Sequence, residues 1–157
     1  MTDEPLRAPE PWAGSEERPL RGIDILLVDD DRDSRTIYGT ILKYYGAHVV
    51  TAQSKPAALK VLTAFIPDII VSDIAMPGGD GLSLMRDVRD LSTRAAFVPA
   101  IAITAFDEEN PQVRTFNAGF QRQLRKPVTP THLCQTILEL VSRSARRARP
   151  GAESAGR

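Results

Sequence analysis

Hydrophobic residues along this 157-residue chain fall into two alternating patterns. Continuous apolar runs, typical of strands buried on both faces, lie within residues 23–28, 68–72 and 98–103, and shorter strands are expected at residues 47–51 and 120–124. After each run, apolar residues recur at the three- or four-residue spacing of an amphipathic helix. Strands that alternate with helices in this way predict an α/β fold: a five-stranded parallel sheet with helices on both faces, doubly wound.

The predicted helices are bounded by cap residues and by glycine or proline. Their inward faces are expected to carry, helix by helix, Ile37, Tyr38, Ile41, Leu42 and Tyr45; Ala58, Val61, Leu62 and Phe65; Leu84, Met85, Val88 and Leu91; Val113 and Phe116; and Leu133, Ile137, Leu140 and Val141. The expected starts include Asp31 or Asp33, Ser54, Asn110 with Pro111, and Pro130, and the expected stops include Gly46, Pro67 and Gly119.

Polar residues suited to chemistry follow four of the strands. Asp29 and Asp30 come after the first strand, Asp73 after the third, Thr104 after the fourth and Lys126 after the fifth. The carboxyl ends of parallel strands meet at one edge of a sheet, and ligands bind there beside a topological switch point. If the first and third strands are neighbours, these five side chains converge on one cleft.

Three carboxylates in this group repel one another unless a cation neutralises them. Hard oxygen ligands favour Mg²⁺, which takes one or two protein carboxylates together with phosphate oxygens. One oxygen of Asp73 then remains available as a nucleophile, while Lys126 supplies a positive charge and Thr104 a hydroxyl donor for an arriving phosphoryl group. The group indicates an aspartyl-phosphate site. Helix capping explains Asp31, but not two further acids in register with a distant acid and a lysine.

Composition limits the class of protein. Apolar residues make up 42% and charged residues 25%, the balance of a folded globular chain. Lysine plus arginine and aspartate plus glutamate are equal at 20 each, which gives no support for a nucleic-acid-coating protein. The single cysteine, Cys134, excludes an internal disulfide and favours a reducing compartment. No apolar run reaches the roughly 20 residues of a membrane span, so we expect a cytoplasmic protein without membrane contact.

The chain is expected to consist of one domain and two arms. Residues 1–22 contain four prolines, five acids and three arginines, with Trp12 as their only large aromatic, which predicts a flexible Pro-rich arm. Residues 23–142 form the domain, and residues 143–157 form a basic, flexible tail. The arginines of the tail suit the negative end of a helix dipole better than a nucleic-acid patch.

Residues 23–141 resemble the receiver domains of two-component response regulators. The resemblance rests on Asp29–Asp30, Asp73–Pro77 with Asp80–Gly81, Thr104–Ala105, and Lys126–Pro127, which follow the order and spacing of the family. It implies a flavodoxin-like (βα)5 fold with Asp73 as phosphoacceptor and with Thr104 and Lys126 on the phosphoryl oxygens. It also implies Mg²⁺ held by Asp29, Asp30, Asp73 and the backbone carbonyl of Ala75, and a cis peptide before Pro127.

The resemblance implies a phosphorelay signalling module, not an enzyme with a separate substrate. A histidine kinase or histidine phosphotransfer protein would donate the phosphoryl group. The modified domain would then change its contacts with a downstream protein through the helix from residue 110, the strand at 120–124 and the helix from residue 130. The residues after Ser142 are too few for a DNA-binding module, so no direct DNA binding is expected. Both a single-domain, chemotaxis-regulator-like protein and the receiver portion of a hybrid histidine kinase stay open.

Three positions depart from the family pattern. Gln123 stands three residues before the lysine, where receivers commonly carry an aromatic switch residue. Ala75 and Phe106, two residues beyond Asp73 and Thr104, cannot position an attacking water by a strong hydrogen bond. We therefore expect slow self-catalysed dephosphorylation.

Two other function classes stay open. A phosphatase of the haloacid dehalogenase type would use Asp29 as its nucleophile, but it would leave Asp73 unexplained and would need a cap insertion that the pattern lacks. A pseudo-receiver would keep the acids without being phosphorylated and would act as a binding module.

Overall fold

The computed structural model describes residues 18–76, 80–105 and 111–147. The strands are β1 (Asp24–Val28), β2 (His48–Ala52), β3 (Ile69–Asp73), β4 (Ala100–Thr104) and β5 (Arg122–Arg125). The helices are α1 (Arg32–Tyr44), α2 (Lys55–Leu62), α3 (Gly81–Arg89), α4 (Pro111–Ala118) and α5 (Pro130–Arg147), with a short 3-10 helix η2 (Arg94–Phe97) before β4. No helix in these ranges is long and apolar enough to cross a membrane.

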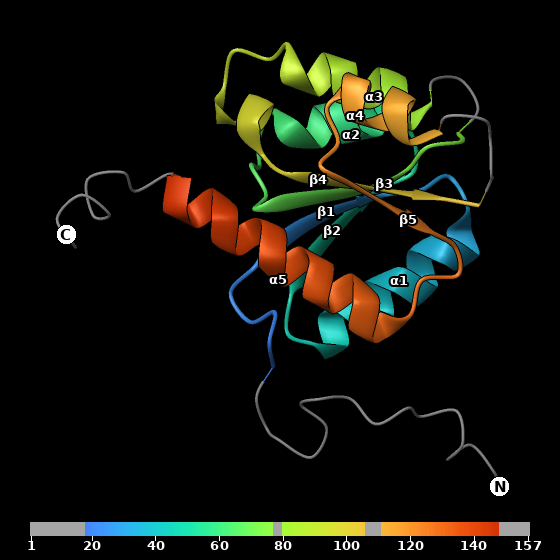
Figure 1. The fold of residues 1–157 in the computed structure, drawn as a ribbon, viewed down its shortest axis with the longest axis vertical. Coiled ribbons are helices and arrows are strands. Elements are labelled where there is room, and N and C mark those ends of the chain that lie inside the picture. Colours follow the sequence, from blue (N-terminus) through green and yellow to red (C-terminus); the bar gives the residue numbers. More distant parts are fainter. Residues whose placement is uncertain (1–17, 77–79, 106–110, 148–157) are drawn as a thin grey trace, which may run out of the picture.

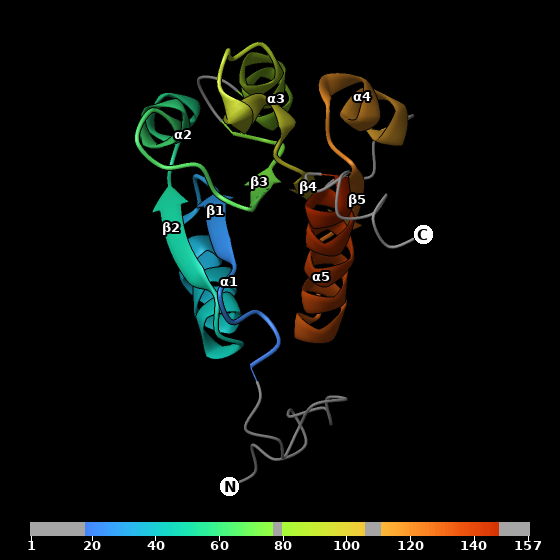
Figure 2. The ribbon, with the colours of Figure 1, turned by 90° about the vertical axis from the view of Figure 1, so that its left-hand side faces the viewer.

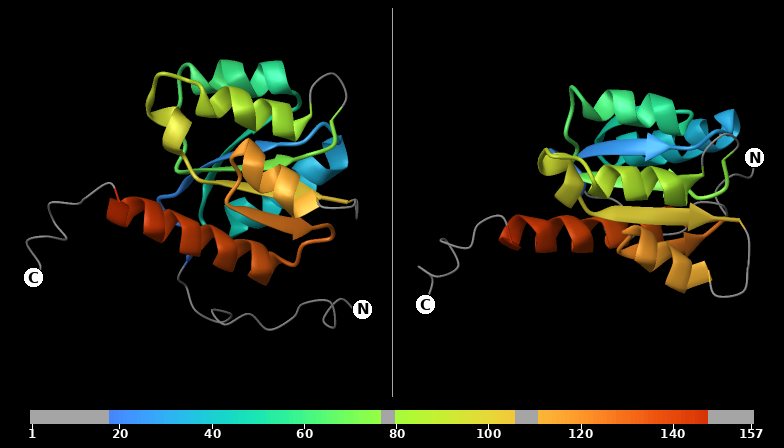
Figure 3. Two further views of the ribbon diagram at one scale, coloured as in Figure 1. Left: turned by 45° about the horizontal axis from the view of Figure 1, so that its top comes forward. Right: turned by 90° about the horizontal axis from the view of Figure 1, so that it is seen from above.

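All strand pairs are parallel, and the strand order is β2-β1-β3-β4-β5. The topological switch point therefore lies between β1 and β3. Helices α1 and α5 cover one face of the sheet, and α2, α3 and α4 cover the other (Figures 1 and 2). Seen from above, the strands point in one direction, so their carboxyl ends share one edge (Figure 3). The predicted doubly wound fold is confirmed, including the first strand beside the third.

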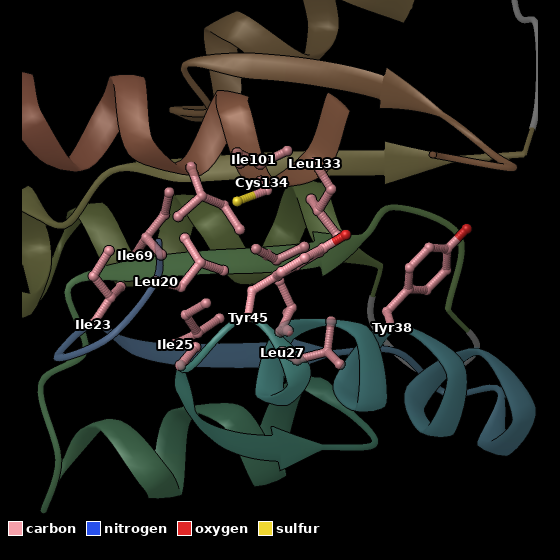
Figure 4. Close-up of a cluster of buried hydrophobic side chains, with 14 of the residues drawn as sticks. Leu20, Ile23, Ile25, Leu27, Tyr38, Tyr45, Ile69, Ile101, Leu133 and Cys134 are labelled. Carbon is pink, nitrogen blue, oxygen red and sulfur yellow. The ribbon is translucent and has the colours of Figure 1, made fainter. Parts of the chain in front are cut away.

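Each face of the sheet packs on its own hydrophobic cluster. Ile25 and Leu27 of β1 belong to the cluster under α1 and α5, whereas Leu26 and Val28 belong to the cluster under α2 and α3. Figure 4 shows the first cluster, where side chains from the sheet meet those of α1 and α5. Burial on both faces explains why the sequence of β1 is a continuous apolar run rather than an alternating one.

Side chains cap the helices as the sequence indicates. Asp31 accepts a hydrogen bond from the backbone N–H of Ser34 at 2.9 Å, which makes Asp31, and not Asp33, the N-cap of α1. Ser54 caps α2 in the same way. Gly46 follows α1 with a φ of 104°, a left-handed conformation that favours glycine.

Two side chains predicted to point inward do not. Ile37 on α1 is 55% exposed and Phe116 on α4 is 50% exposed. In both helices the residue next to the exposed one is buried instead. On α4 the inward residue is Thr115, whose hydroxyl is satisfied by a hydrogen bond to Gln123 of β5. On α1 the buried neighbour is Tyr38.

Three boundaries also differ from the prediction. Helix α2 ends before Phe65. Helix α5 continues to Arg147, so residues 143–147 are helical and not part of a flexible tail. Leu20 is fully buried and its N–H donates to the carbonyl of Tyr45 at 2.8 Å, so the folded unit begins inside the predicted arm. Outside the described residues or side chains lie the predictions for Phe106, Asn110, Val113, and residues 1–17 and 148–157.

Two buried glycines should respond in opposite ways to alanine. At Gly81 an added Cβ would overlap the carbonyl oxygen of Asp73 and lie 2.9 Å from the Cα of Ile74, so Gly81→Ala should lower the free energy of unfolding by about 1–3 kcal/mol. At Gly39 the nearest atom would be Cδ2 of Leu27 at 3.8 Å, so Gly39→Ala should raise it by about 0.5–1 kcal/mol. Urea unfolding measures both, and equal effects would contradict this packing.

Candidate functional site

The parallel register brings the predicted site residues to one edge of the sheet. Asp29 and Asp30 follow β1, Asp73 ends β3, Thr104 ends β4 and Lys126 follows β5. Asp73 pairs with the residue before Thr104, and Thr104 pairs with the residue before Lys126. The edge is the one where the strands flanking the switch point end, as the sequence predicts.

Three carboxylates form a cluster at this edge. Asp29, Asp30 and Asp73 each offer an oxygen, and these oxygens all lie within 4.8 Å of one another. Asp29 is 3% exposed and Asp73 is 8% exposed, whereas Asp30 faces solvent. Backbone N–H groups hold the two buried carboxylates, since Asp31 donates to Asp29 Oδ1 at 2.9 Å and Ala75 donates to Asp73 Oδ1 at 3.2 Å. The cluster is therefore preorganised.

Lys126 brings a positive charge to the cluster. Its Nζ lies 2.9 Å from Asp29 Oδ2 and 3.7 Å from Asp73 Oδ2. Its backbone N–H donates to the carbonyl of Thr104 at 2.8 Å, and the Thr104 side chain is buried beside this strand end. The peptide between Lys126 and Pro127 is cis, as the family resemblance implies. All five predicted residues thus lie together, with the ammonium in direct contact with two of the acids.

Two contacts at the site were not predicted. Lys126 Nζ donates to Ser34 Oγ at 3.3 Å, and Arg35 Nη1 donates to the backbone carbonyl of Asp29 at 2.8 Å. Both residues sit in the first turns of α1, directly after the acidic run. Their position at the start of a helix that begins at the same edge was the available signal in the sequence.

Burial and charge shift the titration of the two central groups. Burial raises the pKa of Asp73 to about 6; the charge of Asp29 adds to the rise and that of Lys126 opposes it. Burial alone would lower the pKa of Lys126, but its hydrogen bond to Asp29 and the charges of Asp73 and Asp29 outweigh burial and raise that pKa. At neutral pH the lysine is charged and Asp73 is mostly ionised, the forms needed for a nucleophile beside a cation.

The ends of the loop after Asp73 are tied together. The N–H of Gly81 donates to the carbonyl of Ile74 at 2.7 Å, and Asp80 caps α3 by accepting from the N–H of Ser83 at 2.7 Å. Residues 77–79, which include Gly78 and Gly79, lie outside the described residues. The tie places the start of α3 against the backbone of Asp73.

Gln123 replaces the aromatic residue of the family pattern with a polar contact. Its Oε1 accepts a hydrogen bond from Thr115 Oγ1 at 2.5 Å, which links β5 to α4. Ala75 is exposed beside the acid cluster. The methyl side chain of Ala75 cannot form a hydrogen bond to a molecule that approaches Asp73.

Asp73 should make stability depend on pH. Because the pKa of Asp73 is about 6 in the native state and 3.8 in its ordinary state, the native protein binds this proton more tightly. The contribution of Asp73 to the free energy of unfolding should therefore fall as pH rises from about 4 to about 6. In EDTA, Asp73→Asn should remove this fall and be more stable than wild type at pH 7.5 by on the order of 1–2 kcal/mol. Urea unfolding across this range tests it, with Asp90→Asn as an exposed control; an unchanged slope in Asp73→Asn would contradict it.

Comparison with known proteins shows the family. Residues 25–138 match the model of the response regulator receiver domain. An uncharacterised 14.6 kDa protein from the sodA1 3′ region of Leptolyngbya boryana is 39% identical over 75% of this chain and 89% of its own length. Hybrid signal transduction histidine kinase D of Dictyostelium discoideum is 34% identical over 88% of this chain, which spans only 9% of that kinase.

A solved structure agrees with the fold. The receiver domain of a sensor histidine kinase from Pseudomonas aeruginosa PAO1, described with a magnesium ion coordinated in its active site cleft, has a TM-score of 0.71 at 26% identity, covering 77% of this chain and 98% of that one. The matched residues include every member of the acid cluster and Lys126. The chain belongs to the response regulator receiver domains, the phosphoacceptor regulatory modules of two-component signalling.

Proposed function

We propose that Asp73 accepts a phosphoryl group from the phosphohistidine of a histidine kinase or a histidine phosphotransfer protein. The observation that carries this proposal is the position of Lys126 Nζ, 2.9 Å from Asp29 and 3.7 Å from Asp73, beside three carboxylates whose oxygens lie within 4.8 Å. The single ammonium of Lys126 leaves the cluster with excess negative charge, which favours binding of a second cation. Once that cation is bound, the site can accept an anionic ligand.

The donor set fits magnesium. Carboxylates of Asp29, Asp30 and Asp73 and the backbone carbonyl of Ala75 are hard oxygen ligands, and Ala75 is already tied to Asp73 by its N–H. Bound there, Mg²⁺ would neutralise charge on the phosphoryl oxygens. The magnesium ion described for the Pseudomonas receiver domain supports this assignment.

The residues of the chain then act in defined roles. An ionised oxygen of Asp73 attacks phosphorus; the O–P bond forms, the bond from phosphorus to the imidazole nitrogen breaks, and its electron pair returns to that nitrogen. Lys126 offsets the charge that develops on the phosphoryl oxygens. Thr104 donates its hydroxyl to one of those oxygens. Burial of Asp73 keeps water away from the nucleophile before the donor docks.

Phosphorylation would alter contacts with a downstream protein over α4, β5 and α5. The hydrogen bond from Thr115 to Gln123 links α4 to β5, so a shift of β5 near Lys126 would also displace α4. The module would act in the cytoplasm, through protein contacts and without binding DNA or membranes. The chain is similar to a small part of a hybrid kinase. A receiver that works within a larger signalling system is therefore a second possibility.

Phosphorylation by acetyl phosphate distinguishes the three candidate functions. With Mg²⁺, mass mapping should place the label on Asp73, and Asp73→Asn should lose it, while Asp33→Asn, an exposed acid on α1, should keep it. Phosphotransfer from candidate kinases should follow the same pattern. Label on Asp29 would support the phosphatase class. Absence of label with intact Mg²⁺ binding would support the pseudo-receiver, and equal labelling of wild type and Asp73→Asn would end the central proposal.

Loss of the phosphoryl group should be slow. Ala75→Asn adds an amide able to orient a water molecule near Asp73, and one hydrogen bond of about 1 kcal/mol corresponds to roughly fivefold in rate. We therefore expect the phosphorylated variant to lose its label several times faster than wild type, measured by phosphate release after removal of donor. Ala75→Val is the matched control without an amide. Loss from wild type within seconds would refute the prediction.

A further inference from the structure

A groove lies at the end of the sheet opposite the acid cluster. It encloses about 420 Å³ and is lined by Phe97 and Pro99 ahead of β4, Arg122 at the start of β5, and Leu140 and Arg143 on the C-terminal half of α5. Phe97, Pro99 and Arg122 lie at the amino ends of β4 and β5, whereas the carboxylates lie at the carboxyl ends of the strands. The groove is therefore separate from the proposed phosphorylation site.

The groove is lined by apolar side chains together with polar and positively charged ones. Phe97 is 84% exposed, more than any other large hydrophobic side chain in the described ranges. Arg122 and Arg143 both contact the same oxygen of Glu139, at 3.2 and 3.0 Å, so two guanidinium groups share one carboxylate. The rim thus carries excess positive charge next to an exposed aromatic ring. A segment with an aromatic residue among acids matches this surface.

The N-terminal segment of this chain has that composition. Residues 1–17 contain five acids against one arginine, and Trp12, the only tryptophan of the protein, lies among them. The segment joins the described chain at Arg18, two residues before Leu20, which is in the same hydrophobic cluster as Leu140 of the groove. Residues 18–22, η2 and the C-terminal end of α5 lie at the same end of the sheet (Figures 1 and 3).

Chain length permits the contact. The five residues between Trp12 and Arg18 span up to about 17 Å when extended. Tethering makes the contact intramolecular, so a weak attraction is sufficient to fill the groove. The C-terminal segment is a poorer match, because residues 148–157 contain two arginines, one glutamate and no aromatic residue.

We propose that residues 1–17 dock in cis into this groove, with Trp12 against Phe97 and the acids near Arg122 and Arg143. Docking would cover the start of β5 and the C-terminal half of α5. It would thereby shield part of the surface assigned to downstream partners, a consequence that rests on the proposed function, although docking itself does not.

Fluorescence of Trp12 tests the proposal directly, because no other tryptophan contributes. In the full chain, emission should be blue-shifted and less quenched by acrylamide than in a peptide of residues 1–17. Phe97→Ser and Arg143→Glu should each move emission toward the peptide value. Ile37→Ser, an exposed apolar residue on α1, and Lys60→Glu, an exposed cation on α2, should leave it unchanged. About 1 M NaCl, which shortens the Debye length to about 3 Å, should weaken the shift.

Several outcomes would overturn docking in cis. Wild-type emission equal to that of the peptide would show that Trp12 is in water. A blue shift unaffected by Phe97→Ser and Arg143→Glu would place Trp12 elsewhere on the protein. A shift that disappears on dilution would assign the groove to the segment of a second copy. Circular dichroism of each variant confirms folding, and because none of these readings needs phosphate, they are independent of labelling at Asp73.

Discussion

The contact of the Lys126 ammonium with the carboxylates of Asp29 and Asp73 is the interaction on which the site depends. Without it, two buried carboxylates and a third at the surface would face one another across less than 5 Å. A lysine at this position reduces that repulsion without cancelling it. The remaining negative charge lets the cluster take a divalent cation, while burial raises the pKa of Asp73 only to about 6 and leaves it ionised at neutral pH.

The parallel register makes this contact possible between residues distant in sequence. Strands β1, β3, β4 and β5 lie in an order that puts the nucleophile in the middle, flanked by the acids on one side and by Thr104 and Lys126 on the other. The hydrogen bond from Gly81 to Ile74 then closes the loop beside Asp73. Packing on both faces of the sheet fixes the register of the strands. The hydrophobic clusters therefore keep the site residues at the same edge.

Much of this arrangement could be predicted from the sequence, because strand ends are local features. An apolar run followed by Asp29 or Asp73 marks the end of a strand, and alternation of elements then places those ends on one edge. The residues that face inward on each helix were harder to predict. Whether Phe116 or Thr115 points inward depends on a hydrogen-bond partner on another strand, Gln123, which no local pattern reveals. The course of α5 to Arg147 was missed because an arginine-rich segment reads equally as a helix end and as a tail.

Two partly buried cations, Arg89 and Lys126, show why one edge of the sheet carries chemistry and the other only stabilises the fold. The guanidinium of Arg89 donates to the carbonyls of Ala96, Val98 and Gly119 at 2.7–3.1 Å, joining α3 to η2, to the residue that follows η2 and to the residue that follows α4. Burial lowers the pKa of Arg89, yet its partners are carbonyl oxygens that neither titrate nor react. Lys126 faces carboxylates, which gain and lose protons, bind metals and attack phosphorus. Similar burial of a cation therefore stabilises the fold at the amino ends of the strands and prepares a nucleophile at their carboxyl ends.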